Sequence, residues 1–189
     1  MKKHSIALLL LLVLLTGCGA KTEEAPWQTA YRETGKYLQE QDALSAGSVG
    51  GEWAVIGLSR AGLLSDETAQ SYEQTVEDYV KQAGSVRLHH AKSTENSRAI
   101  LGLTAAGYNA ANMAGVDLTA GLTDMAYLRA QGTNGPIWAL IALDAGAYAI
   151  PQTVSGTQAS RARYVQTILD AQTENGAWGL AAGSEDVDM

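Results

Sequence analysis

Two kinds of helical pattern alternate along the chain. The polar segments with a narrow apolar stripe are residues 28–40, 66–82, 118–130 and 158–172. The segments that are apolar almost all round are residues 52–64, 96–108 and 136–149. In the stripe of the second polar segment, Tyr72, Val76, Tyr79 and Val80 fall on one face of a helix. Few prolines and no sustained period-two alternation favour helices over strands, so the pattern predicts an all-α fold.

The chain contains an internal repeat. Trp53-Ala-Val-Ile-Gly-Leu matches Trp138-Ala-Leu-Ile-Ala-Leu 85 residues later, and a third apolar segment begins near Asn96, about halfway between them. The repeat unit is therefore a helical hairpin of about 42 residues, which cannot bury both faces of its apolar helix alone. We expect the apolar segments to form an inner layer. Exposure of Ile56 or Ile141 together with Tyr72 and Val76 along the central axis would contradict this arrangement.

The turns between hairpins carry a recognisable motif. Gln172-Thr-Glu-Asn-Gly176-Ala-Trp178 is similar to the QW motif of squalene and terpene cyclases, and Gln131 to Trp138 differs from it by one extra residue. The chain thus resembles the prenyltransferase and squalene-cyclase repeat superfamily. This resemblance implies a partial α/α toroid of stacked hairpins over residues 27–189. It also implies a further inner helix after Met189, so we expect the sequence to be truncated.

A closer resemblance is to Gram-positive surface proteins that look like relatives of the transcobalamin and intrinsic-factor toroid. It is carried by the runs Gly50 to Ala54, Thr94 to Arg98 and Asn134 to Asp144. It implies a bulky ligand of the corrinoid type, such as cobalamin.

The N-terminus has the pattern of a lipoprotein signal. Lys2 and Lys3 precede an apolar run that is too short to span a bilayer. Leu15-Thr16-Gly17-Cys18 then resembles a bacterial lipobox, which implies cleavage before Cys18 and lipid on its sulfur. We expect a signal peptide at 1–17, a lipidated tether at 18–26, and a location on the outer face of the bacterial cytoplasmic membrane. The alternative is a plain secretory signal with an incidental cysteine.

The charge of the chain limits its partners. The formal net charge is -7, and the sequence contains no cluster of basic residues. An acidic chain of this kind argues against nucleic-acid binding and against electrostatic docking on anionic lipid. Membrane association is therefore expected through the lipid on Cys18.

The residues that would support catalysis in this superfamily are incomplete. The resemblance implies a zinc site of Asp, Cys and His in protein prenyltransferases, but Cys18 is the only cysteine and His89-His90 has no partner at ligand spacing. Cyclases use Asp-x-Asp-Asp, whereas Asp186-Val187-Asp188-Met189 has only two of the acids. These acids also suit the first turn of a helix. We predict neither a catalytic residue nor a metal site.

The candidate binding residues lie where the inner helices begin. Convergence of these helix starts would bring six side chains to one rim: Glu52, Trp53, Glu95, Asn96, Asn134 and Trp138. Such a rim can bind a polar ligand, or it can consist of ordinary caps and ties between hairpins.

Three functions remain open on this sequence. The first is a non-catalytic ligand-binding module, and the second is a terpenoid cyclase or prenyltransferase relative. The third is a degenerate scaffold without a ligand. A fold resemblance alone does not choose among them.

Overall fold

The structure is a computed structural model that describes residues 24–41 and 44–180. The chain divides into two compact units, residues 1–34 and residues 35–189. Within the described residues all regular structure is helical, apart from three isolated β-bridges, so the all-α prediction is confirmed. No helix in this part of the chain is long and apolar enough to span a membrane.

The α-helices are α2 (Pro26–Gln39), α3 (Val49–Arg60), α4 (Asp66–Ala83), α5 (Ser93–Ala105), α6 (Met125–Arg129), α7 (Asn134–Ala145) and α8 (Arg161–Asp170). Two short 3-10 helices, η1 (Ala110–Asn112) and η2 (Leu118–Leu122), lie between α5 and α6. Serine caps begin several of these helices. Ser65 accepts a hydrogen bond from the Thr68 amide at 3.1 Å, and Ser48 does the same for Gly51 at 2.9 Å.

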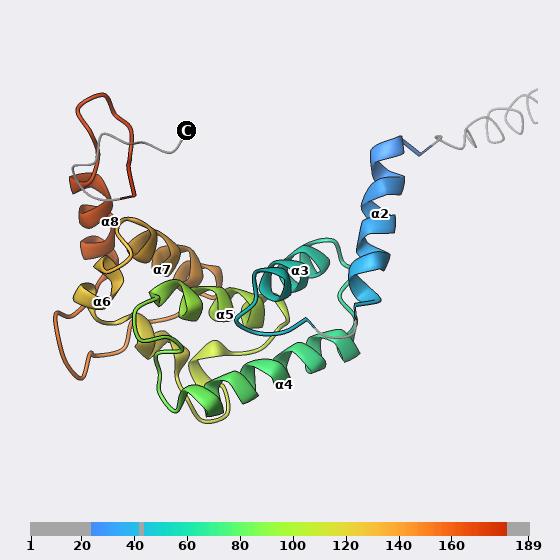
Figure 1. The fold of residues 1–189 in the computed structure, drawn as a ribbon, viewed down its shortest axis with the longest axis horizontal. Coiled ribbons are helices and arrows are strands. Elements are labelled where there is room, and N and C mark those ends of the chain that lie inside the picture. The colour runs from blue at the N-terminus through green and yellow to red at the C-terminus, as the bar shows by residue number, and fades with distance from the viewer. Residues whose placement is uncertain (1–23, 42–43, 181–189) are drawn as a thin grey trace, which may run out of the picture. The chain divides into compact units, whose positions relative to one another are not determined.

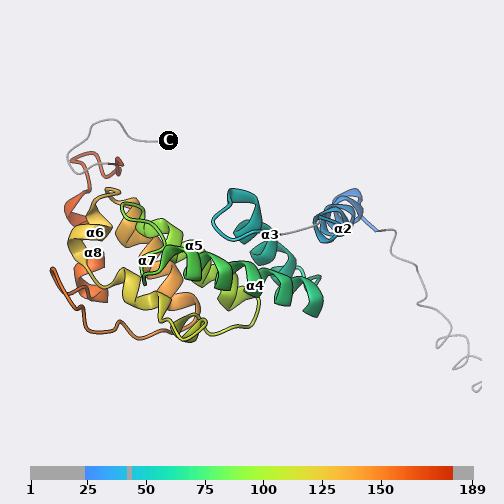
Figure 2. The same ribbon diagram turned by 60° about the horizontal axis from the view of Figure 1, so that its bottom comes forward.

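The helices of the larger unit form two layers. Helix α5 packs against both α3 and α7, which makes α3, α5 and α7 one layer (Figure 1). In the second layer α4 contacts α3 and α5, η2 contacts α5, and α6 and α8 contact α7. Figure 2 shows α5 and α7 side by side from a second direction. The apolar segments thus share one layer and the amphipathic segments cover one side of it.

The core lies between these two layers. Tyr72 and Val76 of α4, Leu103 of α5, Leu143 of α7 and Tyr164 of α8 are all fully buried there. Burying an apolar side chain of this size contributes about 1.5–3 kcal/mol each, so the stripes of the amphipathic helices supply much of the stability.

Among residues 44–180, no helix packs on the other side of the α3–α5–α7 layer. The Ile141 side chain is 44% exposed, and Ile56 is only half-buried. Ile141 is thus open to solvent in the described residues, whereas Tyr72 and Val76 of α4 are buried in the core. Because α7 is apolar almost all round, whichever side lacks a partner exposes apolar atoms.

Segment 118–130 is not one helix, contrary to its periodicity. The chain breaks between η2 and α6 because the Met125 amide donates to Thr157 O at 2.9 Å, and Ala159 N donates to Thr123 O at 2.7 Å. Asp124 then caps α6 by accepting from the Ala126 amide at 3.0 Å. Pairing with the loop before α8 thus replaces the bonds that would continue the helix.

Candidate functional site

The two tryptophans of the sequence repeat meet in space. The ring centroids of Trp53 on α3 and Trp138 on α7 lie 5.4 Å apart, with a tilt of 58° between the ring planes. Because α5 lies between these helices, the rings meet across the uncovered side of α5. Trp53 remains 39% exposed, so the pair forms an aromatic surface open to solvent. Tilted pairs of this kind are favourable aromatic contacts.

The middle repeat places an arginine where the others place tryptophan. Arg98-Ala-Ile-Leu-Gly-Leu aligns with the sequences that begin at Trp53 and Trp138. The Arg98 guanidinium is half-buried and pairs with the Glu95 carboxylate at 2.5 Å. The residues predicted for the rim do not include Arg98, although its alignment with Trp53 and Trp138 would have predicted that it lies there.

Glu52 lies in the first turn of α3 but is only 1% exposed. Its Oε1 accepts a hydrogen bond from the Gly47 amide at 2.6 Å. Burial raises the pKa of the Glu52 carboxyl, against the hydrogen bonds from backbone amides and the positive charge of Arg98, which lower it. Glu52 is thus a buried acid and not an open rim residue.

Three buried polar atoms have no hydrogen-bond partner among the described residues. They are Glu52 Oε2, Tyr72 Oη and Arg98 Nε. Burial raises the pKa of Tyr72, with the charge of Glu52 raising it further and that of Arg98 lowering it. The three groups therefore share an electrostatic environment between α3, α4 and α5.

Asn96 and Asn134 have different surroundings from each other. The buried Asn96 amide donates to Val86 O at 2.6 Å and to Leu118 O at 3.0 Å, and its Oδ1 accepts from the Leu88 amide at 2.9 Å. These bonds hold the loop before α5 and the start of η2 against α5, which is a structural role. Asn134 is exposed at the start of α7.

Glutamines of the two QW-like turns make different contacts. Gln131 Oε1 accepts from Ser93 Oγ at 3.2 Å and from the Thr94 amide at 3.0 Å, so the turn before α7 caps the start of α5. Gln172 instead closes its own turn by donating to Gly176 O at 2.9 Å. Gly176 has a φ of 85°, a conformation that favours glycine.

Trp178 of the second QW-like turn points back to the preceding helix. Its indole Nε1 donates to Ile168 O in α8 at 2.7 Å. The same stretch of chain reaches α7, because the Thr133 amide donates to Leu180 O at 3.0 Å. Turns of the QW type thus join neighbouring hairpins at both α5 and α7.

A cavity of about 260 Å³ lies on the uncovered side of the α3–α5–α7 layer. It is lined by Ile56, Ser59, Arg60, Leu101, Thr104, Ala105 and Ala145. These residues come from the C-terminal halves of all three helices, whereas the Trp53–Trp138 pair lies near the helix starts. The uncovered side thus combines an aromatic surface, an apolar centre and a cavity with one cationic side chain.

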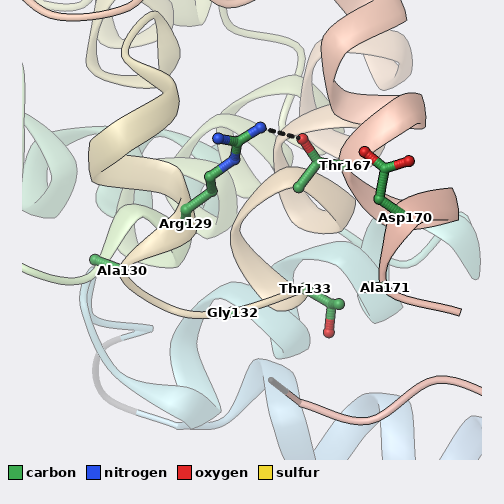
Figure 3. Close-up of a pocket in the computed structure, with 7 residues that line it drawn as sticks. All are labelled: Arg129, Ala130, Gly132, Thr133, Thr167, Asp170 and Ala171. Carbon is green, nitrogen blue, oxygen red and sulfur yellow. Dashed lines mark hydrogen bonds between the residues drawn. The ribbon is translucent and has the colours of Figure 1, made fainter. Parts of the chain in front are cut away.

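A larger cavity of about 550 Å³ lies away from this surface, between the α6–α7 turn and the end of α8 (Figure 3). It is lined by Arg129, Ala130, Gly132, Thr133, Thr167, Asp170 and Ala171. None of these residues was predicted to line a site, because their types and spacing match no binding motif. They come together only through the packing of α6, α7 and α8.

The histidine pair lies in the loop before α5. The rings of His89 and His90 stack 4.4 Å apart, and His89 Nδ1 accepts from the amides of Ala91 and Lys92 at 3.0 and 3.1 Å. Among the residues that the structure describes, no group of three or more His, Cys, Asp or Glu side chains is placed to hold a metal ion. Cys18, Asp186 and Asp188 lie outside the described residues.

Comparison with known proteins adds no relative. No protein-family model matches the chain, and neither a curated protein nor a solved structure matches it.

Proposed function

We propose that this chain is a lipid-anchored, extracytoplasmic helical repeat module that binds a ligand without catalysing a reaction. The observation that carries this proposal is the Trp53–Trp138 pair on the uncovered side of the α3–α5–α7 layer. Exposed aromatic and aliphatic side chains beside a cavity are the usual composition of a ligand surface.

The finer architecture is part of the same proposal. We take the layers as three hairpins of an α/α toroid, with α3, α5 and α7 lining the central axis. The support is the order of packing, in which α5 contacts both other inner helices, together with the ties from the QW-like turns to α5 and α7. In such a ring the uncovered side would face the central cavity.

Binding is favoured over catalysis because the polar groups near the tryptophans are already paired or buried. Glu95 and Arg98 neutralise each other in an ion pair. Glu52 is withdrawn from solvent, with one of its oxygens bound to the Gly47 amide. What remains accessible is mostly apolar surface, which suits recognition of a bulky, flat molecule. A corrinoid has this shape, so cobalamin and cobinamide are the first ligands to test.

The test is a thermal-shift screen on the full chain, purified in detergent. A ligand at 100 times its dissociation constant stabilises the folded state by about 2.7 kcal/mol, which raises the melting temperature. Trp53→Ala and Trp138→Ala should abolish the shift, whereas Trp27→Ala, which changes an exposed tryptophan on α2, should leave it intact. No shift with either corrinoid would remove this ligand class and favour a scaffold that binds nothing.

A second candidate function, a terpenoid cyclase or prenyltransferase relative, is favoured by one observation. Glu52 is a buried acid with a raised pKa, directly before Trp53 in the chain. A carboxyl group whose pKa is raised keeps its proton to a higher pH and can act as a proton donor, which is how an acid starts a cationic cyclisation. Turnover of squalene or a prenyl diphosphate that is lost in Glu52→Gln or Asp186→Asn would replace the binding proposal with this one.

A further inference from the structure

We propose that the 550 Å³ cavity between the α6–α7 turn and α8 binds a small zwitterion, of the class of an α-amino acid with an apolar side chain. This site is separate from the α3–α5–α7 surface and does not depend on the function proposed for it. Its volume falls within the range of about 300–1,000 Å³ that is usual for small-molecule sites.

Opposite charges line the cavity without neutralising each other. In Figure 3 the Arg129 guanidinium and the Asp170 carboxylate lie on either side of Thr167. Neither side chain forms an ion pair with any residue that the structure describes. A ligand with one anionic and one cationic group would pair with both.

Each charged group keeps hydrogen-bonding capacity for a ligand. Arg129 uses Nη2 to donate to Thr167 Oγ1 at 3.0 Å, which orients the guanidinium and leaves its other N–H groups without a described partner. Asp170 Oδ1 accepts from Gln166 Nε2 at 2.7 Å, and its second oxygen stays free of described donors. A carboxylate on Arg129 and an ammonium on Asp170 would both form charge-assisted bonds.

Small residues form the rest of the wall. Ala130, Gly132 and Ala171 provide apolar or absent side chains, and the Thr133 hydroxyl is already bonded to Gly179 O at 3.1 Å. The described part of the wall therefore offers no third charge and little spare polarity. This composition selects a ligand whose side chain is apolar and uncharged.

The test compares leucine with two derivatives by calorimetry on the full chain in detergent. Leucinamide lacks the carboxylate, and N-acetyl-leucine lacks the ammonium. We expect leucine to bind at least about tenfold more tightly than either derivative, since each loses one charge-assisted contact.

Variants assign each contact to its side chain. Arg129→Gln should remove the preference for leucine over leucinamide, and Asp170→Asn the preference over N-acetyl-leucine. Arg163→Gln on α8 and Asp78→Asn on α4, both exposed and outside the cavity, are the matched controls. Ala130→Leu should block all three ligands, because this exposed position lines the cavity.

Circular dichroism of each variant checks that the fold is kept. The proposal is overturned if leucine fails to bind at millimolar concentration, or if leucine and leucinamide bind equally. It is also overturned if Arg129→Gln behaves like Arg163→Gln.

Discussion

A buried carboxylate in the first turn of α3 makes the stability of the molecule depend on pH. Glu52 is desolvated, and its second oxygen has no partner among the described residues. The charged groups that act on it are Arg98 and Glu95 of α5, of which Arg98 favours the ionised form and Glu95 opposes it. The effect of burial is larger than that of the favourable contacts, so the pKa of Glu52 in the folded protein is raised above its ordinary value of 4.5.

We therefore predict the following for Glu52→Gln. Well below pH 4.5 the acid is neutral in both the folded and the unfolded chain, and its stabilising contribution is fully present. As the pH rises through the folded pKa this contribution is lost, by about 1.4 kcal/mol for each pKa unit between the two states. Glutamine cannot ionise. The difference in the free energy of unfolding, Glu52→Gln minus wild type, should therefore increase between pH 4 and pH 7.

Urea unfolding at a series of pH values measures this difference. Glu174→Gln, at an exposed turn position, is the control and should show little change in its difference from the wild type. A constant difference between Glu52→Gln and the wild type over the whole range would contradict the raised pKa.

Gly102 is a position in α5 where glycine is required by packing. A Cβ atom there would lie 2.2 Å from Tyr72 Oη and 2.7 Å from Tyr72 Cζ. Tyr72 is fully buried and cannot move aside without disturbing the core. Gly102→Ala should therefore lower the free energy of unfolding by about 1–3 kcal/mol, the usual cost of overpacking.

Gly57→Ala is the matched control for this change, since nothing lies within 4 Å of the added Cβ on α3. It should stabilise the protein by about 0.5–1 kcal/mol, because alanine favours a helix interior over glycine. Thermal melting of both variants tests the pair. Equal effects would show that Tyr72 does not pack against α5 as described.

At the scale of elements, the turn before α7 completes the start of α5. Lys92 at the N-cap of α5 provides no side-chain cap, and Gln131 supplies the acceptor for the Thr94 amide instead. Gln131→Ala should lower the free energy of unfolding by about 1–2 kcal/mol, comparable to the loss of an N-cap. Hydrogen exchange should speed up in the first turn of α5, while that of α3 stays unchanged.

Gln70→Ala, at an exposed position on α4, is the control for this variant. If hydrogen exchange at the start of α5 is equally fast in Gln131→Ala and Gln70→Ala, the hydrogen bond from the Thr94 amide to Gln131 does not stabilise that helix start.

The alternation of apolar and amphipathic segments predicted the existence of these elements but not all their limits. Segment 118–130 has an unbroken helical stripe, yet Thr123 and Met125 pair with a loop more than 30 residues away. Local periodicity does not report such competition between partners. The repeat placed Trp53 and Trp138 at equivalent positions of α3 and α7, but their contact depends on how these two helices pack on either side of α5. The 550 Å³ cavity could not be foreseen, since it arises from packing between α6, α7 and α8.

At the scale of the whole molecule, we predict that the segment around Cys18 determines where the protein resides. The lipobox-like sequence lies outside the described residues, so this prediction rests on the pattern of residues 2 to 18. Cys18→Ala should prevent lipid attachment, which leaves the chain either released from the membrane fraction or unprocessed. Two lipid chains at one cysteine anchor a protein stably, whereas one chain binds only marginally.

Fractionation and intact mass of the wild type and of Cys18→Ala check this prediction. The wild type should carry the mass of the lipid and start at Cys18. Identical masses after allowance for the substitution, with unchanged fractionation, would exclude the lipid anchor.

The ties between hairpins also set an order in which helices can be completed as the chain is synthesised. The start of α5 bonds to Gln131, which follows Ser93 by 38 residues, and Thr133 at the start of α7 bonds to Gly179, which follows it by 46. On the ribosome, α5 and α7 therefore each emerge before the residues that bond to their first turns, which are translated a full hairpin later. If translation pauses between hairpins, the first turn of the most recently made helix lacks its hydrogen-bond partner and frays. Once the next turn is made, that helix is completed and the following helix is the one left open.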